Sequence, residues 1–361
     1  MTFHTSRTVR RALISGLALA SVAVLAVGCA GSSTAGASAE GSAAAISGSV
    51  IWADYGGPTN ESRQVAYFDG FTADTGVDVV STSLEDSVYY GMLKGDAGDY
   101  DTMQTSAADV LAYTDAVTEV PEDIQGDLLP ENIRPYIVGG FVFGIAQGWL
   151  TETFPNGGPQ DWADFFDTTK YPGKRAWPGS PGSYDASYEI ALLADGVKPA
   201  DLYPLDIPRA EAKLNTIRGD MVFYQSYPEV QQLLSSGSAA IAVTVTGQYN
   251  ALKNAGKDVT VQWNQAFIVP SGFVIPQQAS NPAAALALAA WMNDPERQAV
   301  FTERTGYGPV NSKVFDYLSD DVVSGLVNSP EHEKVGLYWD TQWRSENNDK
   351  LIDSYTAWLA G

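Results

Sequence analysis

The chain has 361 residues, of which 45% are hydrophobic and 11% aromatic, so its composition is that of a globular rather than a disordered protein. The formal charge of −22 disfavours nucleic acids and anionic lipid surfaces as partners. With one cysteine and two histidines in the sequence, a zinc site of the His/Cys type cannot be built. A nucleophilic triad would depend on His332, since His4 lies in the first residues. We therefore expect no metal and no cofactor.

The first 28 residues are arranged as an export signal. Three arginines form a basic start, residues 13–27 are almost wholly apolar, and Cys29 follows small residues. The apolar run is too short for a comfortable membrane span. Because Cys29 is the one cysteine in the chain and cannot form an internal disulfide, we predict that it carries a lipid after signal cleavage.

Two alternatives stay open at this end of the chain. An incidental cysteine in an ordinary secretory signal is the first, because Ala26 stands where lipid-attachment signals usually carry leucine. The second concerns the export route, since the pair Arg10 and Arg11 hints at a twin-arginine signal although the following residues fit that pattern poorly.

Residues 29–47 consist mostly of Ala, Gly and Ser. Such a stretch buries too little apolar surface to offset its ordering entropy, so we predict a flexible tether. Signal, cysteine and tether together predict a folded domain held by a lipid anchor at the extracytoplasmic face of a membrane. The residues that remain are numerous enough for two lobes with their own cores.

The folded part is predicted to begin with a strand, a helix and a strand. Apolar residues 49–52 predict the first strand, apolar residues at three-residue spacing from Val65 predict the helix, and residues 77–80 predict the second strand. A βαβ unit of this kind implies a parallel sheet with helices on both faces. Ligands of such sheets bind beyond the carboxyl ends of the strands, so residues 54–60 are a candidate binding loop.

The remaining elements continue this α/β alternation. Helices are predicted from about residues 191, 210 and 230, and strands at residues 100–106, 141–145, 239–245, 267–269 and 273–275. The strand at 141–145 is expected to cross between lobes, and the last two segments are expected to form the return crossing. Asn281–Pro282 and Asp294–Pro295 are typical of helix starts and predict two further helices.

A series of short motifs follows the tether in a specific order and spacing, although each is weak alone. The motifs begin at Trp52, Phe71, Gly98, Glu189, Tyr203, Trp263, Val274 and Tyr307. On these residues the chain resembles the polyamine- and opine-type solute-binding proteins of ABC importers, which are similar to spermidine/putrescine-binding proteins and have the type 2 periplasmic-binding fold. The resemblance covers essentially all of the chain after the tether.

The resemblance implies two α/β lobes, each a mixed, mainly parallel sheet flanked by helices, joined by crossover strands. Lobe 1 would comprise residues 48–141 plus 271–305, and lobe 2 residues 142–270 plus 306–361. The lobes of such a protein close on a small polar solute, and membrane permease subunits recognise the closed form. The resemblance thus implies a monomeric, non-enzymatic transport receptor. The alternative is a secreted carboxylate-based hydrolase on a similar scaffold.

The same resemblance implies where the solute binds. The expected ligand contacts are Trp52, Tyr55, Ser106, Asp109, Asp185, Trp263 and Tyr307. Polyamine-binding members stack aromatic rings on the methylene chain and pair carboxylates with its ammonium ends. The aromatic half of that pattern is present, but Ser271 stands where one of the carboxylates is expected. A polyamine, an opine and an amino-acid-like solute therefore all stay open, and for each aromatic residue core packing is the alternative role.

Overall fold

The computed structural model describes residues 46–84, 89, 91, 98–180 and 186–361. Two predicted site residues, Cys29 and Asp185, lie outside the described residues, as do the predicted signal and most of the predicted tether. Residues 46–361 form one unit by their contacts.

One eight-stranded sheet runs through this unit in the order β2-β1-β3-β8-β4-β7-β5-β6. Its strands are β1 (Ser49–Asp54), β2 (Asp78–Ser83), β3 (Thr102–Ser106), β4 (Val138–Leu150), β5 (Arg175–Pro178), β6 (Met221–Tyr224), β7 (Ile241–Val245) and β8 (Val259–Val274). Strand β1 pairs in parallel with β2 and β3, and β5 pairs in parallel with β6 and β7. The pairs β3–β8, β8–β4 and β4–β7 are antiparallel. The predicted mixed α/β class is confirmed.

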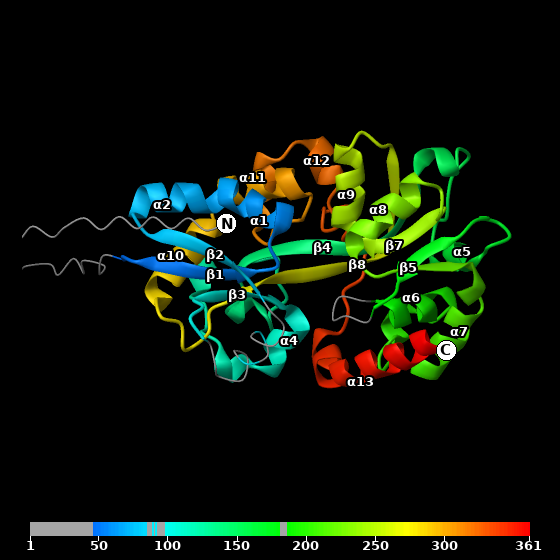
Figure 1. Ribbon diagram of the computed structural model, residues 1–361, viewed down its shortest axis with the longest axis horizontal. Helices are drawn as coiled ribbons and strands as arrows, with labels where there is room; N and C mark the ends of the chain where they lie inside the picture. Colours follow the sequence, from blue (N-terminus) through cyan, green and yellow to red (C-terminus); the bar gives the residue numbers. More distant parts are fainter. Residues whose placement is uncertain (1–45, 85–88, 90, 92–97, 181–185) are drawn as a thin grey trace, which may run out of the picture. The chain divides into compact units, whose positions relative to one another are not determined.

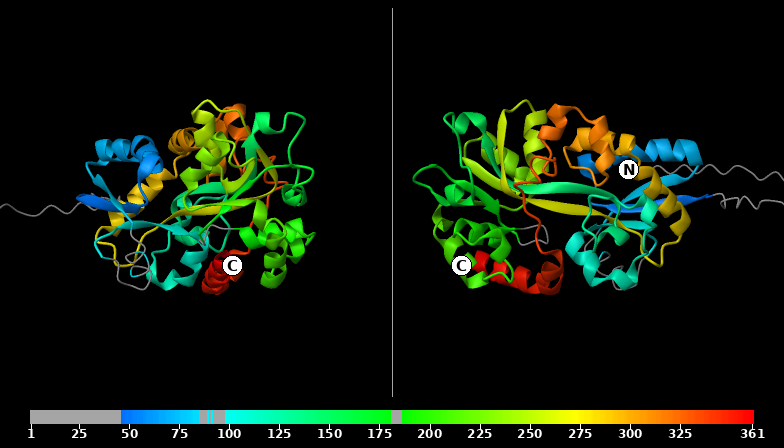
Figure 2. Two further views of the ribbon diagram at one scale, coloured as in Figure 1. Left: turned by 45° about the vertical axis from the view of Figure 1, so that its right-hand side comes forward. Right: turned by 180° about the vertical axis from the view of Figure 1, so that it is seen from behind.

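Helices cover both faces of the sheet (Figure 1). They are α1 (Gly57–Arg63), α2 (Asp69–Thr75), α4 (Ala107–Ala112), α5 (Trp162–Phe166), α6 (Ser187–Ala194), α7 (Ile207–Asn215), α8 (Tyr227–Ser235), α9 (Thr246–Asn254), α10 (Pro282–Met292), α11 (Pro295–Thr305), α12 (Asp320–Ser324) and α13 (Thr341–Ala360). Helices α1, α2, α8, α9 and α11 lie on one face, and α4, α6, α7 and α13 lie on the other, as the reverse view in Figure 2 also shows. Among the described residues, no helix has both the length and the apolar character needed to cross a bilayer.

The two crossing strands hold the halves of the sheet together. Strand β8 pairs with β4 along most of its length and with β3 near its C-terminal end. The segments predicted at 267–269 and 273–275 therefore fall on one continuous strand, which ends at Val274, and the sheet continues from one half to the other. Residues 266–274 of this strand are buried because it lies at the centre of the sheet.

The predicted βαβ opening is confirmed by the parallel pairing of β1 and β2. The helix between these strands is interrupted, because a π-helical segment at Gln64–Phe68 separates α1 from α2. Phe68 and Phe71 are buried as predicted, but Val65 is 53% exposed. The wider i→i+5 turn changes the angular spacing of the side chains, so Val65 does not share the buried face of the two phenylalanines.

The predicted helix starts at Asn281 and Asp294 are also confirmed. The side chain of Asn281 accepts a hydrogen bond from the N–H of Ala284, and that of Asp294 accepts one from Arg297. Strands β5 and β6 were not predicted, since each has only four residues.

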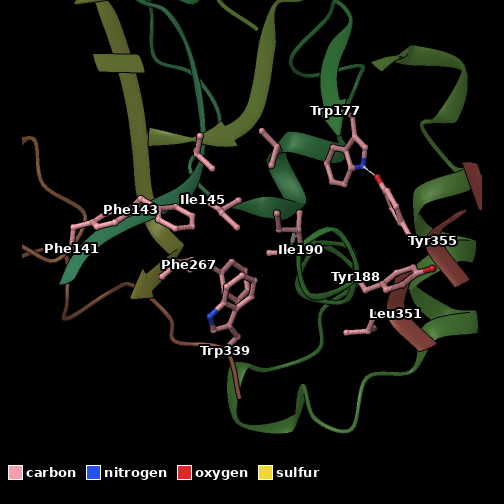
Figure 3. Close-up of a cluster of buried hydrophobic side chains, with 14 of the residues drawn as sticks. Phe141, Phe143, Ile145, Trp177, Tyr188, Ile190, Phe267, Trp339, Leu351 and Tyr355 are labelled. Carbon is pink, nitrogen blue, oxygen red and sulfur yellow. Dashed lines mark hydrogen bonds between the residues drawn. The ribbon is translucent and has the colours of Figure 1, made fainter. Parts of the chain in front are cut away.

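Aromatic residues make up much of the core on the face that carries α6 and α13 (Figure 3). Trp177 in β5 donates a hydrogen bond from Nε1 to the hydroxyl of Tyr355 in α13 at 2.9 Å. Helix α13 also packs against α4, which follows β3. The C-terminal helix thereby contacts elements from both halves of the sheet.

Candidate functional site

A cavity of about 390 Å³ lies beyond the carboxyl end of β1 and is lined by both halves of the sheet. From the N-terminal half it is lined by Tyr55, Gly56, Thr59, Arg63 and Gln104, and from the C-terminal half by Tyr227, Val245 and Gln248. The crossing strands contribute Phe141, Phe143 and Ser271, and Tyr307 follows α11. The predicted binding loop at 54–60 therefore forms part of the wall.

Asp54 organises this loop from the end of β1. Its carboxylate is 1% exposed and accepts hydrogen bonds from the N–H of Gly56 at 2.7 Å and from Asn60 Nδ2 at 2.7 Å. Arg63 Nη1 donates to the same carboxylate at 2.9 Å. Gly56 and Gly57 have φ values of 72° and 70°, a left-handed conformation that glycine adopts without a steric penalty. The turn after β1 thus places the start of α1 at the cavity.

Arg63 is the buried cation of the cavity wall. It is 1% exposed, and its guanidinium carbon lies 4.6 Å from the ring centre of Phe273 and 5.5 Å from that of Phe141. Its Nε and Nη2 atoms are buried and have no hydrogen-bond partner. Burial lowers the pKa of Arg63, and the charge of Asp54 opposes that shift.

Tyr307 forms an aromatic wall of the cavity. Its ring stacks on Phe141 with centroids 5.1 Å apart and an interplanar angle of 25°. Gly247 allows the hydroxyl to approach, since a Cβ at that position would lie 2.9 Å from Tyr307 Oη. Burial raises the pKa of Tyr307, and Arg63 opposes the rise. The phenol is therefore a neutral hydrogen-bonding group at physiological pH.

The structure brings two of the predicted ligand contacts together in the cavity, namely Tyr55 and Tyr307. Trp52 lies elsewhere, in the core. It is 1% exposed, and its ring centre lies 4.0 Å from that of Phe273 and 5.2 Å from that of Phe68. Trp52 is on β1 with its side chain facing the helices that cover the sheet, so the alternative role, core packing, describes its position.

Ser106 and Asp109 are paired with each other rather than with the cavity. Ser106 Oγ donates to Asp109 Oδ2 at 2.8 Å and accepts from the N–H of Asp109 at 3.0 Å, which caps α4. The hydroxyl of Tyr89 donates to the same carboxylate at 2.9 Å. Burial raises the pKa of Asp109, while these hydrogen bonds oppose the rise. Neither residue lines the cavity.

Trp263 also lies away from the cavity. Its ring stacks on that of His332 with centroids 4.4 Å apart and an interplanar angle of 20°. His332 Nδ1 is 2.6 Å from the carbonyl oxygen of Leu326, which holds the imidazole in place. No three His, Cys, Asp or Glu side chains within the described part of the chain gather as metal ligands would.

Sequence reasoning missed several lining residues, namely Arg63, Gln104, Phe141, Phe143, Tyr227 and Gln248. Arg63 had one signal, because it follows the candidate loop and stands nine residues after the strand-end Asp54. Gln104 comes from β3, and the others come from the crossing strand β4 and from helices of the C-terminal half. Their meeting depends on the order of strands in the sheet, which the local pattern does not contain.

Comparisons with known proteins define the class to which this fold and cavity belong. Residues 66–328, more than half of the chain, match the family described as bacterial extracellular solute-binding protein. The gamma-aminobutyric acid-binding protein of Pseudomonas aeruginosa is 25% identical over 328 residues, covering 88% of this chain and 92% of the relative.

Solved structures agree with this match. The Atu4243 GABA receptor has a TM-score of 0.78 at 25% identity, covering 86% of this chain and 97% of that one. AgtB from Agrobacterium tumefaciens R10 in complex with agropinic acid has a TM-score of 0.73 at 28% identity, covering 87% and 99%. An ABC transporter substrate-binding protein from Bradyrhizobium japonicum USDA 110 has a TM-score of 0.78 at 25% identity, covering 86% and 99%.

These matches define a two-lobed solute-binding protein that works outside the cytoplasm. The chain belongs to the bacterial extracellular solute-binding protein family. Its role is solute binding, and the alternative of a carboxylate-based hydrolase finds no support among these relatives.

Proposed function

We propose that this protein is the receptor of an ABC importer and that it takes an amino-acid-like or opine-like solute into the cavity at the end of β1. The observation that carries the proposal is the composition of the wall, in which Tyr55 of one lobe faces the same cavity as Tyr227, Gln248 and Tyr307 of the other. A cavity lined from both sides is what a closing trap requires. The relatives named for gamma-aminobutyric acid and agropinic acid support this class of solute.

The lobes of this trap are residues 48–141 plus 271–305 and residues 142–270 plus 306–361. Strands β4 and β8 pass between them, and their antiparallel pairing supports a hinge at this place. A solute held by both lobes stabilises the closed arrangement by its differential contacts. The permease subunits then receive the solute from the closed form, and the solute leaves chemically unchanged.

A polyamine is the second candidate, because aromatic walls suit a methylene chain. Among the lining residues that the structure describes, however, none is acidic. Asp54, the nearest carboxylate in the loop, already pairs with Arg63. A diamine would therefore enter a wall with a buried cation, which favours the amino-acid-like or opine-like solute.

We further propose that the protein acts as a monomer anchored through a lipid on Cys29. The signal-like arrangement of the first 28 residues and the cysteine that follows it support the anchor. The family's extracellular setting supports the location at the outer side of the membrane that carries the importer.

The test is isothermal titration of the purified mature chain with 4-aminobutyrate, agropinic acid, putrescine and glucose, followed by mass spectrometry of the recovered solute. The proposal predicts saturable one-to-one binding of 4-aminobutyrate or agropinic acid and full recovery of the unchanged compound. Chemical turnover of the bound compound would contradict it, as would binding of putrescine or glucose alone.

A further inference from the structure

The guanidinium of Arg63 has two edges with different roles. Nη1 is committed to Asp54 Oδ2 at 2.9 Å. Nε and Nη2, which share the adjacent edge of the same planar group, are buried without a protein acceptor. Arg63 is also one of the residues that line the cavity, so a buried guanidinium with two unused donors belongs to the wall of the proposed solute site.

Burial of these donors is costly unless an acceptor meets them. A buried donor without a partner has lost the hydrogen bonds that water supplied, and the cost is larger when the group is charged. The rings of Phe141, Phe273 and Phe301 surround the guanidinium carbon at 5.5, 4.6 and 5.5 Å. They stabilise its charge, but they exclude water and supply no oxygen acceptor. The arrangement is therefore prepared for an acceptor that arrives with the solute.

A carboxylate is the group that fits this edge. Two parallel N–H donors of a guanidinium match the two oxygens of a carboxylate, and such charge-assisted pairs are about twice as strong as neutral hydrogen bonds. We propose that Arg63 binds a carboxylate of the solute through Nε and Nη2, so that the cavity selects carboxylate-bearing solutes. This inference rests on the proposed function, because it requires that the cavity is the solute site. Asp54 is then a positioning residue that orients the guanidinium.

Gln248, a second residue that lines the cavity, also has hydrogen-bond donors to offer a solute. Gln248 Oε1 accepts from Gln231 Nε2 at 2.7 Å. The carbonyl side of the Gln248 amide is thereby engaged outside the cavity, which leaves its N–H groups as the donors available to a solute. Donors from Arg63 in one half and Gln248 in the other suit an anionic group that both lobes contact.

The ligand test compares solutes that share a four-carbon chain and differ at one end. Isothermal titration of the wild-type chain uses 4-aminobutyrate, 4-aminobutanamide and putrescine, together with agropinic acid and its amide. The carboxylates should bind at least about tenfold more tightly than the matched amides, because the amide loses one acceptor and the charge. Equal or tighter binding of the amides or of putrescine would overturn the inference about Arg63. The protein would still be a solute receptor in that case. If none of the five compounds binds, both the inference and the proposed solute class fail.

The variant test uses Arg63→Lys, which keeps the charge near Asp54 and removes the planar fork. The matched control is Arg175→Lys, because Arg175 is equally buried but donates to the backbone carbonyls of Phe165 and Tyr171 at 3.0 and 2.7 Å, away from the cavity. Arg63→Lys should reduce the carboxylate-over-amide preference by at least about tenfold, and Arg175→Lys should leave the preference unchanged. A folded Arg63→Lys variant with the wild-type preference would overturn the assignment. If that variant does not fold, the wild-type comparison of carboxylates with amides still decides.

Discussion

Arg63 Nη1 donates to Asp54 Oδ2 at 2.9 Å, and both side chains are 2% exposed. The pair joins the end of β1 to the end of α1 and encloses the loop that lines the cavity. A buried ion pair of this kind contributes little net stability, but the loss of one partner leaves an uncompensated charge.

Asp54→Asn should therefore lower the free energy of unfolding by about 3–5 kcal/mol, since it leaves the Arg63 charge buried without its counterion. Urea denaturation measures this change. The control is Glu331→Gln in the exposed pair with Lys334, where solvent screens the ion pair and the expected loss is much smaller. Equal losses in the two variants would show that the Asp54–Arg63 pair is solvated in solution.

Tyr307→Ala should weaken solute binding by about tenfold or more, because it removes the ring that stacks on Phe141 in the cavity wall. Titration calorimetry with the tightest ligand of the panel measures the effect. Tyr317, which is 52% exposed and does not line the cavity, supplies the control variant Tyr317→Ala with unchanged affinity. Unchanged affinity in a folded Tyr307→Ala variant would place the solute elsewhere.

Asp109→Asn tests the buried cluster beneath α4. Burial raises the pKa of Asp109 above its ordinary 3.8, so the protonated carboxyl is the form favoured by the fold. Its contribution to stability is fully present below pH 3.8 and is lost as the pH rises through the pKa of the folded state. The stability of the wild type relative to Asp109→Asn should therefore fall as the pH rises above 3.8. Urea denaturation between pH 3 and pH 8 measures the difference, and a difference that rises with pH would contradict the assignment.

We expect the fluorescence of Trp263 to depend on the protonation of His332, because the two rings stack on each other. Burial lowers the pKa of His332 below its ordinary 6.5, while the hydrogen bond to the Leu326 carbonyl and the charge of Glu331 oppose the shift. The contribution of the neutral imidazole is present above pH 6.5 and is lost as the pH falls through the pKa of the folded state. Tryptophan fluorescence should change below pH 6.5, and the change should be absent in Trp263→Phe and in His332→Gln. If both variants show the same pH-dependent fluorescence change as the wild type, the change belongs to another group.

Cys29→Ser should release the protein from the membrane. If Cys29 carries the lipid, wild-type cells labelled with a fatty acid should yield a labelled chain in the membrane fraction, and the variant should be unlabelled and soluble. A membrane-bound, labelled variant would contradict the lipid anchor on this residue.

The elements that were predicted from sequence are those whose pattern is local. Asn281–Pro282 marks α10 because the cap and the proline act within one turn, and the apolar residues of β1 and β4 mark strands because both lie inside the sheet. The π-helical turn at Gln64–Phe68 was not predicted, since apolar residues at three-residue spacing do not distinguish i→i+5 from i→i+4 hydrogen bonds. The continuity of the sheet through β8 was missed for a similar reason, because strand pairing is a long-range property.

In the candidate site, too, the residues predicted from sequence follow a local pattern, and those that were missed depend on long-range packing. The loop after β1 was predicted as a binding loop because ligands of parallel sheets bind beyond the carboxyl ends of the strands. Tyr55 lies in this loop. Trp52, three residues earlier, is on the strand itself and faces the core, so sequence proximity to the loop did not place it in the cavity. Arg63 was missed because its unpaired edge exists only once Asp54 and the aromatic rings surround it.

The most direct measurement is a crystal structure of the protein with the tightest-binding member of the solute panel. We expect the solute in the cavity between Tyr307 and Tyr227, with a carboxylate within hydrogen-bond distance of Arg63 Nε and Nη2. A solute bound outside this cavity would contradict the proposed solute site, and a solute bound in it with an amine or hydroxyl facing Arg63 would contradict carboxylate recognition by Arg63.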